Sequence, residues 1–132
     1  MSLSSLARED RRDAERIEAG LRTFFRIADA WELSPDEAMV LLGSPPRSTF
    51  YKWRSGDVGR VPPDTLERLS HLFGVYGALH SIFSAPERAD GWVRRPNQAA
   101  AFGGRSALDR MLDGRVADLW EVRRHLEGLT AL

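Results

Sequence analysis

Apolar residues recur at helical spacing along most of the chain. Steps of three and four residues return to the same face of an α-helix, so such a stripe predicts one buried helical face. The first predicted helix carries the stripe Ile17, Leu21, Phe24, Ala28 and Trp31. Residues 1–14 lack a comparable stripe. Because chain ends without buried anchors tend to fray, we expect a flexible N-terminus there.

A capping box marks the start of a second helix. Ser34 is a good N-cap, Glu37 follows it three residues later, and Pro35 suits the first helical turn. Gly43 ends this helix, and a third, short helix is predicted over residues 47–55. A capped helix, a glycine turn and a second helix with a polar outer face have the proportions of a helix-turn-helix.

Helical spacing continues through the second half of the chain. Helices are predicted over 64–84, over 107–113 and from residue 116 onward, with a connector over 86–95 and a helical turn over 98–102. No run alternates between apolar and polar residues with the period of two that a half-buried strand requires. The sequence therefore predicts an all-α fold.

The predicted helices divide the chain into two modules joined by the long helix. Residues 15–85 contain the helix-turn-helix, and residues 86–132 form a small helical C-terminal module. The first helix and the long helix carry more apolar positions than a small monomer readily buries. We therefore expect the N-terminal module to form a homodimer.

The composition is typical of a compact cytoplasmic protein. The 132 residues carry 19 basic and 19 acidic side chains and no cysteine. The absence of cysteine excludes disulfides and cysteine-based zinc sites, and it fits a reducing compartment. The longest stretch without a charged side chain, residues 69–86, has 18 residues and contains serine and histidine. We expect a buried helix there and no membrane partner.

Basic residues concentrate around the second helix of the predicted helix-turn-helix. Residues 44–60 carry four basic side chains and one acidic side chain, a net charge of +3, in a chain of zero total charge. Phe50 and Trp53 are three residues apart and share the inward face, so polar and basic residues face outward and can contact base edges and phosphates. The predicted DNA-binding residues are Arg47, Ser48, Thr49, Tyr51, Lys52, Arg54 and Arg60. The alternative is a solvated face without a DNA role.

Catalysis has no candidate residues in this sequence. His71 and His80 are nine residues apart on one predicted helix, so they lie on different faces and do not form a metal pair. His125 and Glu121 form a helical surface pair of an ordinary kind. The sequence also lacks a glycine-rich phosphate loop and a nucleophilic serine elbow. We therefore expect that the protein is not an enzyme and that it binds no cofactor and no small-molecule substrate.

The C-terminal third contains a specific motif. Trp92 precedes a Pro-Asn pair at 96–97, a Phe-Gly-Gly turn follows at 102–104, and the last helix carries Val-Arg-Arg-His-Leu at 122–126. This pattern resembles the toxin-binding domain of the Xre/MbcA/ParS-type antitoxins, and its position after a helix-turn-helix and a long helix matches that family. The family commonly has proline after the capping serine, where this chain has Ala107.

The resemblance implies the antitoxin of a type II toxin–antitoxin operon. Its cognate partner would be a RES-domain toxin that consumes NAD, and the C-terminal module would block the active site of that toxin. The resemblance also implies that the protein binds operator DNA as a dimer and represses its own operon.

Aromatic and arginine side chains, which are typical anchors of protein interfaces, supply the predicted toxin contacts. Trp120 is a further anchor-type residue, and the short apolar tail 128–132 is expected to enter the toxin. The alternative for Trp92, Phe102 and Leu108 is a place in the core of the C-terminal module. The predicted contacts are Trp92, Arg94, Arg95, Asn97, Phe102, Gly103, Gly104, Arg105, Arg123, Arg124, Leu129 and Leu132.

Two other functions stay open at this point. The chain can be a stand-alone helix-turn-helix transcriptional regulator whose C-terminal module only dimerises. It can also be a helical adaptor that binds only protein. A toxic neighbouring gene distinguishes an antitoxin from the regulator, and binding to DNA excludes the adaptor.

Overall fold

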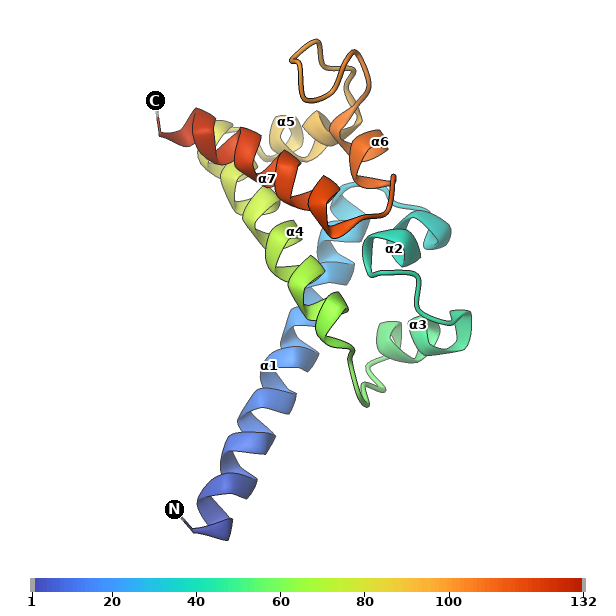
Figure 1. Ribbon diagram of the computed structural model, residues 1–132, viewed down its shortest axis with the longest axis vertical. Coiled ribbons are helices and arrows are strands. Elements are labelled where there is room, and N and C mark those ends of the chain that lie inside the picture. Colours follow the sequence, from blue (N-terminus) through green and yellow to red (C-terminus); the bar gives the residue numbers. More distant parts are fainter. Residues whose placement is uncertain (1, 132) are drawn as a thin grey trace.

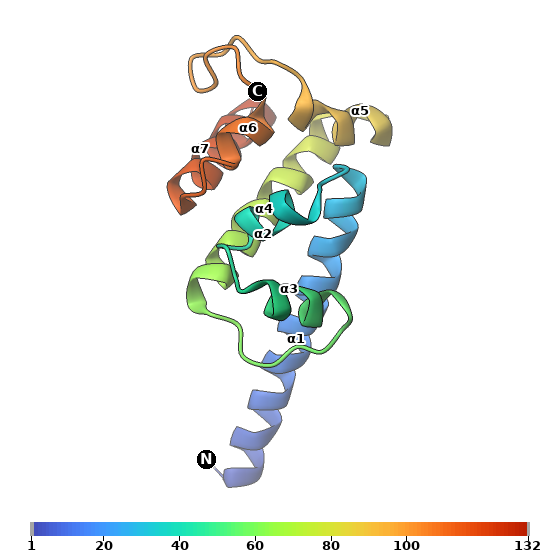
Figure 2. The same ribbon diagram turned by 90° about the vertical axis from the view of Figure 1, so that its right-hand side faces the viewer.

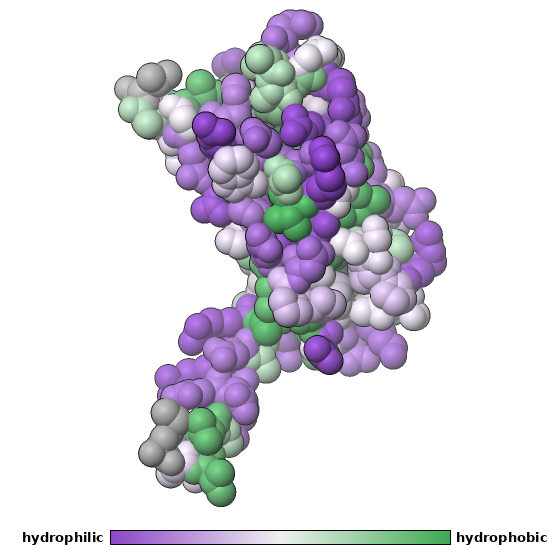
Figure 3. Space-filling view, in the orientation of Figure 1, coloured by the Kyte–Doolittle hydropathy of each residue, from purple (hydrophilic) through white to green (hydrophobic). Residues whose placement is uncertain are grey.

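A 28-residue helix, α1 (Leu3–Ala30), forms the long axis of the molecule. In this computed structural model, which describes residues 2–131, the first half of α1 extends away from the other helices (Figure 1). The segment expected to be flexible, residues 1–14, is helical from Leu3 onward and largely exposed. Apolar side chains gather at the free end of this helix (Figure 3), where Leu3 is 85% exposed.

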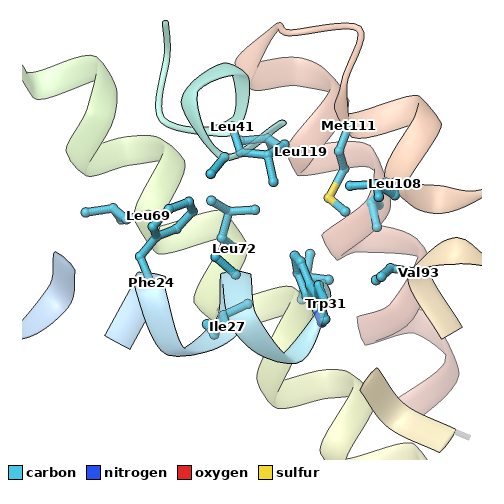
Figure 4. Packing of buried hydrophobic residues seen from close by; sticks show 14 of the residues in the cluster. Phe24, Ile27, Trp31, Leu41, Leu69, Leu72, Val93, Leu108, Met111 and Leu119 are labelled. Carbon is cyan, nitrogen blue, oxygen red and sulfur yellow. The ribbon is translucent and has the colours of Figure 1, made fainter. Parts of the chain in front are cut away.

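The apolar stripe of α1 becomes its buried face, as predicted. Ile17 is half-buried, whereas Leu21, Phe24, Ala28 and Trp31 are buried. These side chains meet residues of the helices that follow, and Figure 4 shows Phe24 and Trp31 pointing into the interior that they share with the C-terminal helices. The second half of α1 is therefore part of the core.

Helices α2 (Pro35–Leu41) and α3 (Arg47–Arg54) form the predicted helix-turn-helix beside α1. The capping box of α2 is present: the Glu37 amide donates to Ser34 Oγ over 3.1 Å, and the Ser34 amide donates to Glu37 Oε1 over 2.8 Å. Phe50 and Trp53 of α3 are 1% and 3% exposed. Their burial confirms the predicted inward face.

Helix α4 (Pro63–Ile82) runs along α7 (Val116–Thr130), and the two helices form the centre of the molecule (Figure 1). Leu72 and Val75 of α4 and Leu119 and Val122 of α7 are fully buried. The buried residues of both ends of the chain belong to one continuous cluster. The all-α fold class is therefore confirmed, and the helix-turn-helix shares its core with the C-terminal helices.

The prediction for residues 86–102 was wrong in detail. The expected connector contains α5 (Pro86–Gly91) and a 3-10 turn, η1 (Trp92–Arg94), because Pro86 starts a short helix that buries Ala89 completely. The expected helical turn at 98–102 is a series of irregular turns. Helix α6 (Ala107–Met111) follows. Within residues 2–131 the structure has no strand, only an isolated bridge between residues 96 and 106, and no helix long and apolar enough to span a membrane.

The turn between α2 and α3 depends on Gly43. Its φ is +95°, which is the left-handed region that glycine enters at least cost. The hydroxyl of Thr65, at the start of α4, donates to the carbonyl oxygen of Leu42 over 2.8 Å. A side chain at position 43 would also place its Cβ 2.7 Å from Oδ2 of Asp64. The turn is thus held against α4 at van der Waals distance.

Arg68 of α4 joins this turn to the C-terminal module. Its side chain is buried, and Nε donates to Oδ2 of Asp64 over 2.8 Å. Its Nη2 donates to the carbonyl oxygen of Gly114, in the loop between α6 and α7, also over 2.8 Å. One guanidinium therefore connects the helix-turn-helix, the start of α4 and the loop before α7.

Substitution of Gly43 by alanine tests this close approach, and Gly56→Ala is its matched control. Gly56 has a φ of +93° but no neighbouring atom within 4 Å, so alanine there adds backbone strain alone, about 1 kcal/mol. Gly43→Ala adds a clash with Asp64 and should lower the free energy of unfolding by about 2–3 kcal/mol. Urea denaturation of both variants measures the difference, and equal losses would show that position 43 is not tightly packed.

Candidate functional site

The outer face of α3 is open to solvent. Tyr51 is 43% exposed, and its ring packs edge-to-face on Phe50 at a centroid distance of 5.2 Å. Thr49 is half-buried at the edge of this face. The structure therefore brings the predicted DNA-binding residues of α3 together on one surface, and the exposed members are Arg47, Ser48, Tyr51, Lys52 and Arg54. Arg60 is exposed in the loop that follows.

The cations of this surface differ in their partners. Arg47 Nη2 donates to Oδ1 of Asp36 over 2.9 Å, and the hydrogen bond with this carboxylate raises the pKa of Arg47. Within the part of the chain that the structure describes, Lys52, Arg54 and Arg60 form no ion pair. Their charges are available to an anionic partner.

The Phe-Gly-Gly motif forms a closed loop between residues 96 and 106. The Gly104 amide donates to the carbonyl oxygen of Asn97 over 2.8 Å, and the Asn97 amide donates to the carbonyl oxygen of Arg105 over 3.0 Å. Gly103 and Gly104 have φ values of +59° and +90°. Phe102 is only 3% exposed. The motif therefore builds the loop, and Phe102 lies in the core rather than on a contact surface.

The ring of Phe102 packs between two neighbouring aromatic side chains. It packs edge-to-face against half-buried Trp92 at 6.0 Å and against His125 of α7 at 5.0 Å between ring centroids. Leu108 is 2% exposed in the same core. The core alternative for Phe102 and Leu108 thus agrees with their burial.

Four of the five arginines predicted to contact the toxin are bonded inside the chain, three of them before α7 and Arg123 within α7. Arg94 donates from Nε to the carbonyl oxygen of Trp31 over 2.9 Å and from Nη2 to that of Glu32 over 2.7 Å. It therefore supplies hydrogen-bond donors to free carbonyl groups at the C-terminal end of α1. Arg95 donates to the carbonyl oxygen of Arg88 over 2.9 Å. Arg105 binds both carboxylate oxygens of Asp113, at 3.1 and 2.9 Å. These bonds position the C-terminal module.

A buried carboxylate that sequence reasoning missed lies at the start of α7. Asp118 is 0% exposed and receives hydrogen bonds from Nε of Arg110 over 3.1 Å and from Nη2 of Arg115 over 2.9 Å. It also accepts from the Arg115 amide over 3.0 Å, which caps α7. Asp118 lies three residues after Arg115, the residue at the N-cap of α7. An acidic residue at this spacing is the sequence signal that could have identified the cap.

The outer face of α7 is an exposed surface of the C-terminal module. Trp120 is 45% exposed, and the guanidinium carbon of Arg124 lies 5.3 Å from the centre of its ring. Arg123 forms an ion pair with Glu127 and lies across Gly74 of α4, where any side chain would collide with it. A cleft of about 530 Å³ opens here, lined by His71, Trp120, Arg123, Arg124, Glu127 and Gly128.

The tail of the chain continues this surface. Leu129 is 42% exposed in the last turn of α7, next to the cleft residue Gly128. Leu132, also predicted to contact the toxin, lies outside the residues that the structure describes. Of the predicted toxin contacts, Arg124 and Leu129 thus lie on an exposed surface with Trp120, whereas Phe102 is buried in the core. Arg94, Arg95 and Arg105 are exposed as well, but their guanidinium groups are bonded within the chain.

Histidines and carboxylates do not assemble into a metal site between residues 2 and 131. His80 Nε2 lies 2.9 Å from Oδ1 of Asp90, which joins the end of α4 to α5. His71 Nε2 lies 3.9 Å from Glu67 Oε1 on the same helix.

Comparison with known proteins identifies both modules. Residues 10–74 match the antitoxin Xre-like helix-turn-helix domain, and residues 78–130 match the antitoxin Xre/MbcA/ParS C-terminal toxin-binding domain. An uncharacterized protein, y4oB, of Sinorhizobium fredii (strain NBRC 101917 / NGR234) is 53% identical over 115 residues, which cover 87% of each chain. No solved structure matches the chain.

The buried Asp118 predicts a pH dependence of stability. Burial alone would raise the pKa of this carboxyl, but hydrogen bonds from Arg115 and Arg110 lower it overall. The folded state therefore favours the ionised form of Asp118. The resulting stabilisation is present above the pKa of this carboxyl in the unfolded chain, about 3.9, and is lost as the pH falls below that value. Asp118→Asn should lower the free energy of unfolding by about 2–3 kcal/mol near neutral pH.

Urea denaturation of both proteins between about pH 7 and pH 3 measures this effect. The difference between Asp118→Asn and the native protein should shrink as the pH falls. Asp113→Asn is the control, because Arg105 lowers the pKa of that carboxyl too, but at an exposed position where the loss should be smaller. A difference for Asp118 that is constant with pH would contradict the assignment.

Proposed function

Because the chain belongs to the Xre/MbcA/ParS family of antitoxins, we propose that it neutralises a cognate RES-type, NAD-consuming toxin and represses its own operon. The toxin would be blocked by the C-terminal module, which covers its active site. The operator would be bound by a dimer through the outer face of α3. The protein acts in this proposal as a binding protein in the cytoplasm, without catalysis, cofactor or small-molecule substrate.

The observation that carries this proposal is the presence of two separate exposed surfaces on one body. The cationic face of α3 and the surface formed by Trp120, Arg124 and Leu129 on α7 lie on different parts of the molecule (Figure 1). An antitoxin that also represses needs one surface for DNA and another for the toxin. A stand-alone regulator needs only the first and a dimer contact.

The surface on α7 fits a protein partner. An exposed tryptophan with an arginine stacked on its ring is the kind of pair that anchors protein interfaces. The adjoining cleft of about 530 Å³ can accept a side chain of the partner. We therefore assign the first contact with the toxin to Trp120 and Arg124, followed by Leu129.

An apolar cleft between α1 and α4 supports the proposed dimer. It has a volume of about 270 Å³ and contains half-buried Ile17, Leu66 and Phe73. These residues belong to the two helices in which the sequence has surplus apolar positions. A second copy that covers them would bury apolar area and place two α3 helices on one operator.

Co-expression with the adjacent open reading frame tests the antitoxin function. If the neighbouring gene encodes the toxin, its expression alone should arrest growth, and the chain should restore growth and copurify with its product. Absence of both toxicity and a complex would leave the stand-alone regulator as the function of this chain.

Single substitutions should separate the two activities. Lys52→Ala removes one phosphate contact and should weaken binding to the upstream DNA and make its salt dependence less steep by about one unit. Trp120→Ala removes an interface anchor and should weaken the complex with the toxin by about 2 kcal/mol or more. Each variant should retain the other activity, which controls for folding, since both side chains are exposed. Loss of toxin neutralisation in Lys52→Ala would contradict the assignment of the surfaces.

A further inference from the structure

A cationic cleft of about 310 Å³ lies between α1 and the end of α3. Residues 22–29 of α1 line one side and residues 53–56 line the other. Three arginines, Arg22, Arg26 and Arg54, face a single acid in this cleft, Asp29, which gives it a net charge of +2. We call it the α1–α3 cleft.

The arginines of the α1–α3 cleft differ from those of the C-terminal module. Arg105, Arg110 and Arg115 each bind a carboxylate of the chain. Among the ion pairs of residues 2–131, none includes Arg22, Arg26 or Arg54. Neighbouring like charges repel, so a cleft that collects three guanidinium groups with one acid favours an anion.

We propose that the α1–α3 cleft binds a backbone phosphate of the DNA that α3 contacts, through Arg22 and Arg26 of α1. A guanidinium offers paired N–H donors that match the oxygens of a phosphate. Contacts of this kind carry no sequence information, but they fix the orientation of a recognition helix on the duplex. The inference rests on the proposed DNA binding and extends it to a helix outside the helix-turn-helix.

The position of the cleft favours DNA over the toxin as the source of the anion. Arg54 belongs both to the predicted DNA surface of α3 and to the cleft, so the two surfaces are continuous. Helix α3 lies beside α1 and away from α7 in both ribbon views (Figures 1 and 2). An anion in the cleft is therefore next to the element that contacts DNA.

The packing between the two helices holds the cleft in a fixed geometry. Phe25 of α1 packs edge-to-face on Phe50 of α3 at 5.5 Å between ring centroids, and Trp53, which also lines the cleft, is buried. Arg22 and Arg26 are one helical turn apart, so both side chains project from the same side of α1. Their distance from α3 is thus set by the core rather than by a mobile loop.

The double variant Arg22→Gln/Arg26→Gln tests the proposal by the salt dependence of DNA binding. Fluorescence anisotropy would measure Kd at several KCl concentrations for two duplexes of equal length, one from the region upstream of the gene and one of scrambled sequence. Loss of this phosphate contact should make the slope of log K against log salt less steep by about one and weaken binding about fivefold at roughly 0.15 M salt. The effect should be equal on both duplexes.

Two matched variants and the toxin assay complete the experiment. Arg11→Gln/Arg12→Gln removes the same charge from the exposed first half of α1 and should leave the slope unchanged. Arg22→Lys/Arg26→Lys keeps the charge and should keep the slope. Toxin neutralisation by Arg22→Gln/Arg26→Gln should match that of the native protein, which shows that the fold is intact.

Three outcomes would overturn the proposal. The first is a native slope in Arg22→Gln/Arg26→Gln, and the second is an equal change in the Arg11 and Arg12 variant, which would indicate a net-charge effect. The third is loss of toxin neutralisation with unchanged DNA affinity, which would assign the cleft to a protein contact. If the native protein binds neither duplex, the proposed repressor function fails together with this inference, whereas the first three outcomes leave that function standing.

Discussion

The buried guanidinium of Arg68 is the interaction on which the relative position of both surfaces depends. It lies against Gly43 in the turn of the helix-turn-helix, binds Asp64 at the start of α4 and donates to Gly114 before α7. A buried charge is costly unless it is paired and hydrogen-bonded, so the bonds to Asp64 and Gly114 offset the cost of burying this guanidinium. The Arg68–Asp64 ion pair also requires a glycine at position 43, because a Cβ there would displace the Asp64 carboxylate.

The arginines of this chain divide into a structural set and a set available to partners. Arg94, Arg105, Arg110 and Arg115 bind carbonyl oxygens or carboxylates of the chain and hold the short C-terminal helices, which are too short to be stable alone. The cations around α3 form no ion pair within residues 2–131, apart from Arg47 with Asp36. The neutral total charge of the chain conceals this division. Local pairing, rather than net charge, therefore indicates which surface suits an anionic partner.

Sequence patterns were sufficient for most of the elements and insufficient for the contacts between them. The capping box at Ser34 and the inward pair Phe50 and Trp53 were predictable because each depends on residues three positions apart. The helix α5 was missed because its six residues carry too few apolar positions for a periodic signal, and its burial of Ala89 depends on the rest of the core. The bonds of Arg94 to residues 31 and 32 connect positions 63 and 62 apart in sequence, which no local spacing indicates. Residue type alone therefore suggested Phe102 and Arg94 as contacts, whereas in the structure Phe102 is buried and exposed Arg94 is hydrogen-bonded to the end of α1.

The shared core constrains how the two activities can respond to substitution. Buried residues of α1, α4 and α7 belong to one cluster, so the helix-turn-helix and the toxin-binding module are expected to unfold together. A substitution that destabilises the core then reduces the folded population and lowers both activities by the same factor. Substitution of an exposed residue on one of the two proposed contact surfaces, such as Trp120 or Lys52, is expected to change one binding free energy and to leave the folded population unchanged. Loss of a single activity therefore identifies a contact residue, whereas loss of both activities identifies a residue of the scaffold. In a chain with one continuous core, this distinction can be made without a structure of either complex.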